Sequence, residues 1–183
     1  LDKVGTGTIT LAGNNTYTGG TTVAGWGANG TLTSTLSTSG TPFGTGSINL
    51  TGATLGLAPS ATGATSLTGA SASGATFTYA GGVILSLTQK DTSSPLTFTV
   101  GDGTSDPLVR GGTGTLTLYQ ANPVATAGSA NMPNALAVTN GYFVKVSGSG
   151  AALPSVTNGI VNPSVVTRVA GLTATNALTV VTS

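Results

Sequence analysis

The sequence predicts an all-β protein whose short strands are joined through regularly spaced glycine turns. Runs that alternate threonine with an aliphatic residue recur along the chain, and a period of two is that of a strand. Glycine, with 29 residues, separates these runs. The motif G-T-G-[ST]-[IL]-[TN]-L occurs at 5–11, 44–50 and 112–118, and such repetition is typical of stacked architectures. A parallel β-helix (a β-solenoid) and an antiparallel β-sandwich both fit this periodicity.

The expected strands of the first half follow from this alternation. In chain order they are 5–11, 21–23, 31–39, 44–50, 54–57, 76–79 and 83–87. Gly81 and Gly82 have the pattern of a tight turn between the last two of these strands. The small, polar stretch 58–75 is either a loop or a weakly patterned turn of a solenoid.

The second half is expected to continue in the same way. Its expected strands are 96–100, 112–118, 136–138, 142–146, 165–169 and 176–181. The stretch 119–135 contains two prolines and is too long for an ordinary connection, which predicts an excursion from the fold or a binding loop. No helical period and no charged linker divides the chain, so 1–183 is expected to be a single domain. With about 20–25 residues per turn, a solenoid of this length has roughly eight turns.

The first repeat carries a longer signature than the other two. Residues 3–11, followed by N-N-T-Y-T-G-G-T-T-V at 14–23, resemble the autotransporter-associated β-strand repeat. Members of that family are large passenger regions of bacterial surface proteins, so the resemblance implies a parallel β-helix displayed outside the cell and favours it over the sandwich. The copy at 112–118 keeps Asn122 in the place of Asn15, whereas the copy at 44–50 keeps only the strand.

The composition bears on partners and location. Only 5% of the residues are charged and the formal net charge is +1, which gives no basic surface for nucleic acid. No apolar run approaches the roughly 20 residues of a membrane helix, so membrane insertion is not expected. Because the chain begins with Leu1 and not with methionine, we expect a processed piece of a longer exported precursor, and the absence of cysteine is compatible with export.

The chain lacks most of the residues that catalysis requires. It contains no His, Cys or Glu, which excludes a Ser-His-Asp triad, a thiol nucleophile and a zinc cluster. We therefore expect no enzymatic activity and no cofactor; a polysaccharide-degrading β-helix enzyme is a distant alternative, since it needs clustered carboxylates. Asp102 and Asp106 are weak candidates for a calcium site. Their positions beside a glycine and a proline favour a simpler role in the turn.

The other charged and aromatic residues have structural interpretations. The cations are expected on solvated faces or edges, and they are Lys3, Lys90, Arg110, Lys145 and Arg168. Tyr17, Trp26 and Tyr142 are expected to pack in the core or at corners, and stacking on cell-surface glycans is the alternative.

The two ends of the chain suggest assembly. Each end is a nearly uncharged strand with no recognisable cap, and the residues expected to pair are Val4, Ile9, Leu11, Leu178, Val180 and Val181. Exposed strands of this kind are templates for another chain, so we expect an extracellular structural protein on the bacterial surface. Its copies would join head to tail, or by strand exchange, into a homopolymeric fibre or filament. The alternative is a fragment of a monomeric adhesin passenger, whose neighbouring repeats cover both ends.

Overall fold

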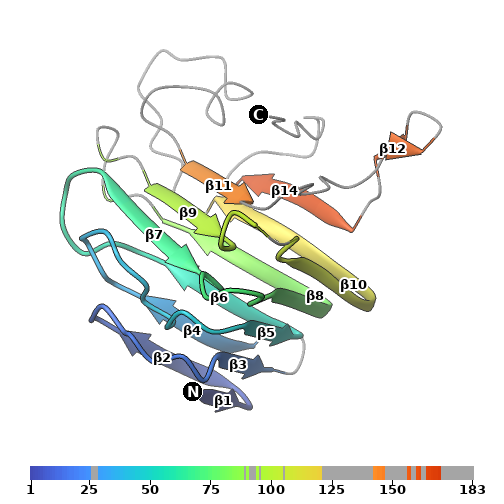
Figure 1. Cartoon of the computed structure of the whole chain (residues 1–183), viewed down its shortest axis with the longest axis horizontal. Helices are drawn as coiled ribbons and strands as arrows, with labels where there is room; N and C mark the ends of the chain where they lie inside the picture. The colour runs from blue at the N-terminus through green and yellow to red at the C-terminus, as the bar shows by residue number, and fades with distance from the viewer. Residues whose placement is uncertain are drawn as a thin grey trace.

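The computed structural model describes residues 1–25, 29–88, 90, 94, 96–104, 106–120, 142–146, 156–157, 160–161 and 164–169. These residues form strands and turns without any helix, and hence without a helix that is long and apolar enough to cross a membrane. The strands (Figure 1) are β1 (Asp2–Val4), β2 (Gly7–Leu11), β3 (Thr21–Ala24), β4 (Gly30–Ser34), β5 (Ile48–Thr51), β6 (Ala53–Leu57), β7 (Thr65–Gly69), β8 (Phe77–Leu87), β9 (Leu96–Val100), β10 (Leu108–Gln120), β11 (Tyr142–Val146), β12 (Val156–Thr157), β13 (Ile160–Val161) and β14 (Val165–Val169).

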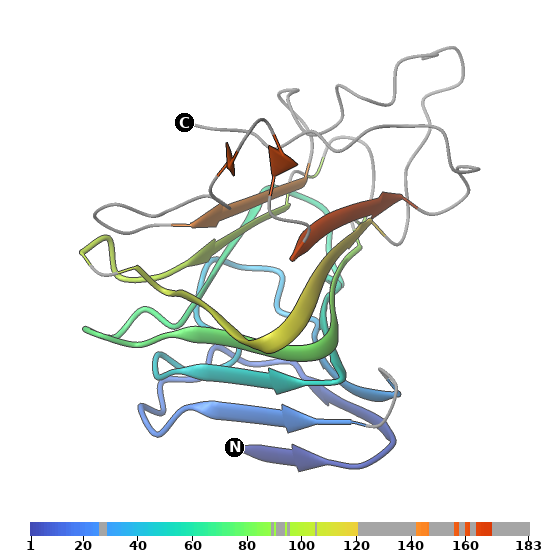
Figure 2. The same ribbon diagram turned by 90° about the vertical axis from the view of Figure 1, so that its right-hand side faces the viewer.

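The chain winds into a coil with three faces, seen from the side in Figure 2. Face A stacks β1, β3, β5 and the first parts of β8 and β10. Face B stacks β2, β4, β6, the second parts of β8 and β10, and then β14. Face C stacks β7, β9 and β11. All of these pairings are parallel, which confirms the predicted parallel β-helix and excludes the antiparallel sandwich; only the short β12–β13 pair is antiparallel.

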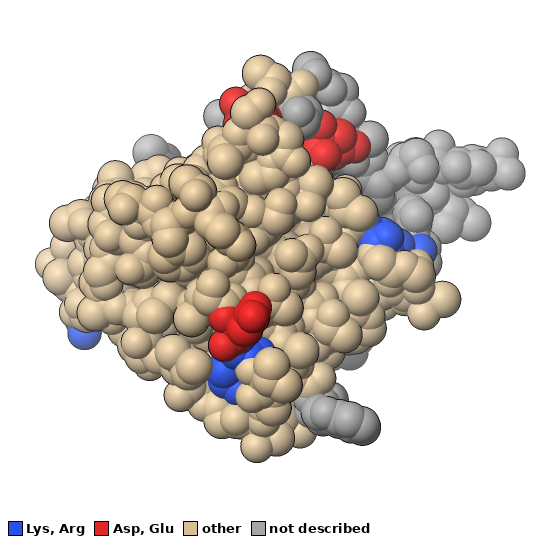
Figure 3. Space-filling model, turned by 60° about the horizontal axis from the view of Figure 1, so that its bottom comes forward, with Lys and Arg blue, Asp and Glu red and all other residues tan. Residues whose placement is uncertain are grey.

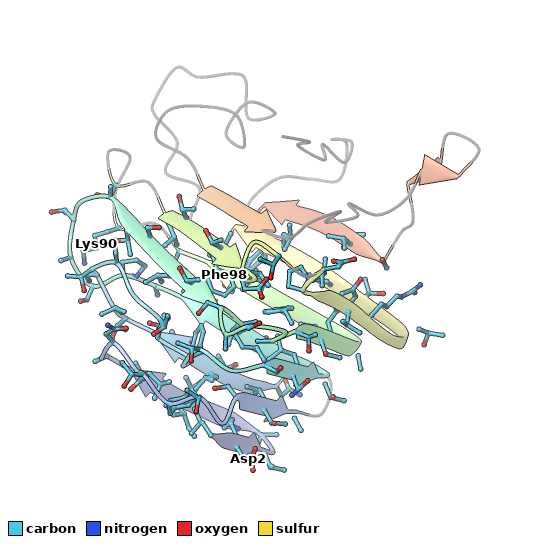
Figure 4. All side chains as sticks on the ribbon, viewed as in Figure 1. Asp2, Lys90 and Phe98 are labelled. Atoms are coloured by element: carbon cyan, nitrogen blue, oxygen red, sulfur yellow. The ribbon has the colours of Figure 1, made fainter. Side chains whose placement is uncertain are left out.

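The register of the strands builds the core. On face B, Leu32 lies above Ile9 and below Leu55, and Leu85 continues the same column. The threonines between these aliphatic residues point outward, since successive side chains of a strand alternate between its two sides. Phe98 is fully buried and meets Phe43 and Phe77 edge to face, with ring centroids 6.5 Å apart in each case. Figure 4 shows Phe98 inside the coil.

Glycine makes the corner between faces A and B. Gly5, Gly52, Gly81 and Gly112 all adopt a positive φ there, a conformation that side chains disfavour. The backbone ladder continues through this corner, because the Gly5 N–H donates to Ala24 O (2.9 Å) and the Gly52 N–H donates to Ala80 O (3.0 Å). The expected tight turn at Gly81–Gly82 is therefore wrong. β8 runs through this corner from one face to the next, and its two halves pair with strands of other turns and not with each other.

The turns of the coil are longer than predicted. The spacing between stacked residues on face A rises from 20 residues (Asp2 to Thr22) to 31 residues (Thr78 to Val109). Within the described residues, the five strands of face A from β1 to β10 lie 20 to 31 residues apart, so most of these turns are longer than the predicted ~20–25 residues. One cause is insertion at the corner between faces B and C, where residues 58–64 separate β6 from β7.

The predicted strands have mixed outcomes. Those at 54–57, 96–100, 142–146 and 165–169 are confirmed by β6, β9, β11 and β14. The stretch 58–75 contains β7, so it is a turn of the coil and not only a loop. Of 119–135, the first two residues end β10, and the rest lies outside the described residues, as do the expected strands at 136–138 and 176–181.

The three motif copies do not occupy one position in the coil. The copies at 5–11 and 112–118 lead from a corner into face B, whereas the copy at 44–50 leads from a corner into face A. The motif therefore marks a glycine corner followed by a strand, wherever the coil needs one.

Candidate assembly site

Residues 1–20 form the first described turn of the coil, here called rung 1, and among the described residues this turn has a neighbouring turn on one side only. Within the described part of the chain, β1 pairs with β3 and β2 pairs with β4, and these two strands stand at the ends of the sheet order. Figure 2 shows them at the bottom of the coil. The side of rung 1 that faces away from the coil is called the open edge below.

Hydrogen bonds to the second turn identify the backbone groups at the open edge. Leu1 O accepts from the Thr22 N–H (2.8 Å), and Leu11 O accepts from the Thr35 N–H (2.9 Å). Because the direction of the backbone groups alternates along a strand, those of the intervening residues point the other way. The open edge therefore presents donors and acceptors from Asp2, Val4, Thr8 and Thr10.

Apolar side chains gather in the same rung. Val4 is 75% exposed, Leu1 42% and Ile9 37%, whereas Leu32, directly above Ile9, is fully buried. Leu11 packs partly against the core. The predicted residues Val4, Ile9 and Leu11 thus lie together in rung 1, with Ile9 in an interior column and Val4 on the outer side of β1. Leu178, Val180 and Val181 lie outside the described residues.

Lys3 is the main departure from the sequence-based picture. It was expected on a solvated face or an edge, and it does lie on the edge strand β1, but its side chain is only 5% exposed and stands in the interior column of Val23 and Leu50. Its ammonium group donates to Gly5 O (2.7 Å) and Thr6 O (3.1 Å), with a longer contact to Val4 O (3.5 Å). Contrary to expectation, this end of the coil carries a polar group, and an inward charge is one way in which proteins protect an edge.

Asparagine side chains hold rung 1 to the second turn. The described structure has no strand between β2 and β3, and only isolated backbone bonds tie this stretch to the chain above, from the Asn15 N–H to Thr41 O (3.1 Å) and from the Thr45 N–H to Tyr17 O (3.0 Å). In addition, Asn14 Oδ1 accepts from the Thr41 N–H (2.8 Å) and hydroxyl (3.1 Å), while Asn15 Nδ2 donates to Pro42 O (2.6 Å). The Tyr17 hydroxyl shares a hydrogen bond with Thr21 Oγ1 (2.7 Å). The N-N-x-Y signature is therefore a substitute for strand pairing.

Removing both amides is expected to loosen rung 1. Each hydrogen bond contributes about 0.5–1.5 kcal/mol net, so Asn14→Ala with Asn15→Ala should lower the free energy of unfolding by about 2 kcal/mol. Chemical denaturation measures this change in the free energy of unfolding. Asn49→Ala, at an exposed position on the outer side of face A, is the matched control and should change it by under about 0.5 kcal/mol. Equal effects of the two variants would contradict the role given to these side chains.

The two candidate metal ligands are engaged within their own corner, between β9 and β10. Asp102 accepts from the Thr104 N–H (2.8 Å) and hydroxyl (2.8 Å), and also from the Gly74 N–H (3.2 Å) of the turn below. Asp106 accepts from the Leu108 N–H at 3.4 Å. Both carboxylates thus stabilise turns, as the simpler interpretation predicts. Among the described residues, no group of three or more His, Cys, Asp or Glu side chains gathers in one place.

Charge is sparse on the face that includes the open edge. Figure 3 brings this end of the molecule forward and shows a few charged groups, among them an acidic and a basic group side by side, on an otherwise uncharged surface. Lys90 is exposed, as expected, and Arg110 is exposed with its Nε donating to Gly114 O (2.7 Å). Lys145, Arg168, Trp26 and Tyr142 have side chains outside the described part.

A comparison with known protein families gives a match that includes rung 1. Residues 1–25 match the family model of the passenger-associated-transport-repeat. The match spans one turn of the coil, from β1 to the end of β3, and contains the Asn14–Asn15 contacts. It indicates an autotransporter passenger region, and with it a surface-exposed bacterial protein. No curated protein and no solved structure matched the chain.

Proposed function

We propose that this chain is an extracellular structural protein whose copies join at the open edge of rung 1 into a filament on the bacterial surface. The observation that carries the proposal is the coincidence of two features there. The backbone groups of β1 and β2 lack a strand on one side within the described residues, and the exposed aliphatic side chains Leu1, Val4 and Ile9 lie in the same rung.

The energetics of strand addition favour such a contact. A paired strand of five residues forms about five backbone hydrogen bonds, each worth ~1 kcal/mol net, and it also covers apolar side chains. With a formal net charge of +1, little long-range repulsion opposes the approach of a second copy. The donor in this proposal is 176–181, where Leu178 and Val180 alternate with threonine and valine. A head-to-tail contact that does not close on itself gives a fibre.

A second candidate is a segment of a monomeric adhesin passenger, and the repeat match at 1–25 favours it. In that case, neighbouring repeats of a longer protein cover the open edge, and the partners are cell-surface glycans. Both candidates are non-enzymatic and need no cofactor. They differ in whether the isolated chain associates with itself.

Charge placed in the proposed donor strand should stop growth. Leu178→Lys with Val180→Lys buries two ammonium groups at the contact, which strand pairing does not tolerate. Light scattering against concentration should show large particles for the unaltered chain and monomers for this variant. Thr31→Lys with Thr33→Lys adds the same charge on the outer side of β4, away from the edge, and should still grow. A monomeric unaltered chain at high concentration would instead support the adhesin candidate.

A further inference from the structure

Two of the three motif copies are preceded by a cation at the same distance. Lys3 stands two residues before the G-T-G at 5–7, and Arg110 stands two residues before the G-T-G at 112–114. The third copy has a proline in that place. The two copies with a cation are also the two that lead into face B. The cation therefore accompanies the G-T-G sequence only at the corner between faces A and B.

The pairing register puts both cations in one column of face A. Lys3 aligns with Val23, Arg110 aligns with Tyr79, and both of these partners align with Leu50. The three residues between the cations are buried, so the column lies on the inner side of its strands. In their three turns, the corner that follows contains no G-T-G. Across the five turns of face A, a G-T-G corner thus occurs only where this column holds a cation.

Both cationic side chains donate to backbone carbonyls of the corner that follows them. The Lys3 ammonium group donates to Gly5 O (2.7 Å) and Thr6 O (3.1 Å). The Arg110 Nε donates to Gly114 O (2.7 Å). A carbonyl that turns away from the strand ladder needs another donor. A charged donor gives a stronger hydrogen bond than a neutral one.

We infer that the sequence K/R-x-G-T-G is a conformational latch, in which the cation binds the corner carbonyls and so fixes the path of the chain from face A into face B. Arg110 therefore marks a second corner of the same kind as that of rung 1, outside the matched residues 1–25. The inference is independent of the proposed assembly, because every contact of a latch lies within one turn of a single copy.

Hydrogen exchange tests the first latch at the Gly5 amide, which donates to Ala24 O (2.9 Å) across the corner. Lys3→Met keeps an unbranched stem and removes the donors, so this amide should exchange about tenfold faster or more, as expected for the loss of hydrogen bonds from a charged group. Lys3→Arg keeps charged donors and should restore most of the protection. Lys90→Met removes an exposed cation and is the control, with no change expected at Gly5.

The second latch gives the reciprocal test. Its reporter is the Leu116 amide, which donates to Ser164 O (2.7 Å) just beyond the corner. Arg110→Met should speed exchange at Leu116 by a similar factor and leave Gly5 unchanged, whereas Lys3→Met should leave Leu116 unchanged. Because Arg110 is exposed, its variant decides the question even where Lys3→Met does not fold.

Two results would overturn the latch. Equal exchange at the reporter amides in the latch variants and in Lys90→Met would show that the cations do not hold the corners. Faster exchange spread equally over β9 would show that they stabilise the whole coil and not one corner each.

Discussion

Phe98→Ala is expected to lower the free energy of unfolding by about 3–5 kcal/mol, the usual range for a large aromatic residue removed from a core. Phe98 is fully buried on β9 and contacts Phe43 and Phe77 edge to face. The neighbouring strand makes room for its ring, because a Cβ on Gly69 would stand 2.8 Å from Phe98 Cζ. The rings thus join residues of the second and the fourth turns of the coil.

Chemical denaturation of matched variants checks this expectation. Phe98→Leu keeps much of the apolar volume and should lose less than half as much stability. Ile84→Ala removes an aliphatic side chain from the outer side of face B and should lose at most about 1 kcal/mol. A loss below about 1 kcal/mol for Phe98→Ala would show that the aromatic cluster is not the centre of the core.

Gly46→Ala is expected to separate rung 1 from the second turn. A Cβ at Gly46 would overlap Thr18 O and lie 2.6 Å from the backbone nitrogen of Gly20. Both neighbours are backbone atoms of rung 1, so no side chain can rotate away, and the rung itself must move. Overpacking of this kind costs about 1–3 kcal/mol. Rung 1 has no second neighbour within the described residues to hold it, so we expect local loss of structure there.

Hydrogen exchange locates that loss. In Gly46→Ala, amides of β1 and β2 should exchange faster than in the unaltered chain, while those of β9 stay protected. Gly13→Ala is the control, because nothing lies within 4 Å of a Cβ at that position and its φ is not positive. Similar exchange in the two variants would mean that close packing at Gly46 does not hold rung 1 in place.

The strands were largely predictable, because their signal is local. Threonine alternating with leucine or valine gives β6 and β9 directly, since one side of each strand lines the core. That alternation did not predict the parallel stacking of the strands, because the strands of an antiparallel sandwich alternate in the same way. It came from the resemblance of the first repeat, and N-N-x-Y proves to be the part that fastens one turn to the next.

Features set by distant pairing were missed. Gly81–Gly82 reads locally as a hairpin turn, and only the pairing of β8 with β5 and β6 makes it a corner. The inward direction of Lys3 and the outward direction of Val4 were not predicted, and a shift of one residue would reverse every side chain of the strand. The alignment of Lys3 with the buried Val23 sets that parity. No sequence signal within β1 reveals it.

X-ray diffraction from aligned fibres of the purified chain tests whether copies assemble through the open edge of rung 1. Copies that join at the open edge continue the coil along its axis, so their strands lie across the fibre. We expect unbranched filaments with a reflection near 4.7–4.9 Å along the fibre axis. Monomers at every concentration, or filaments with this reflection perpendicular to the axis, would contradict assembly through the end of rung 1.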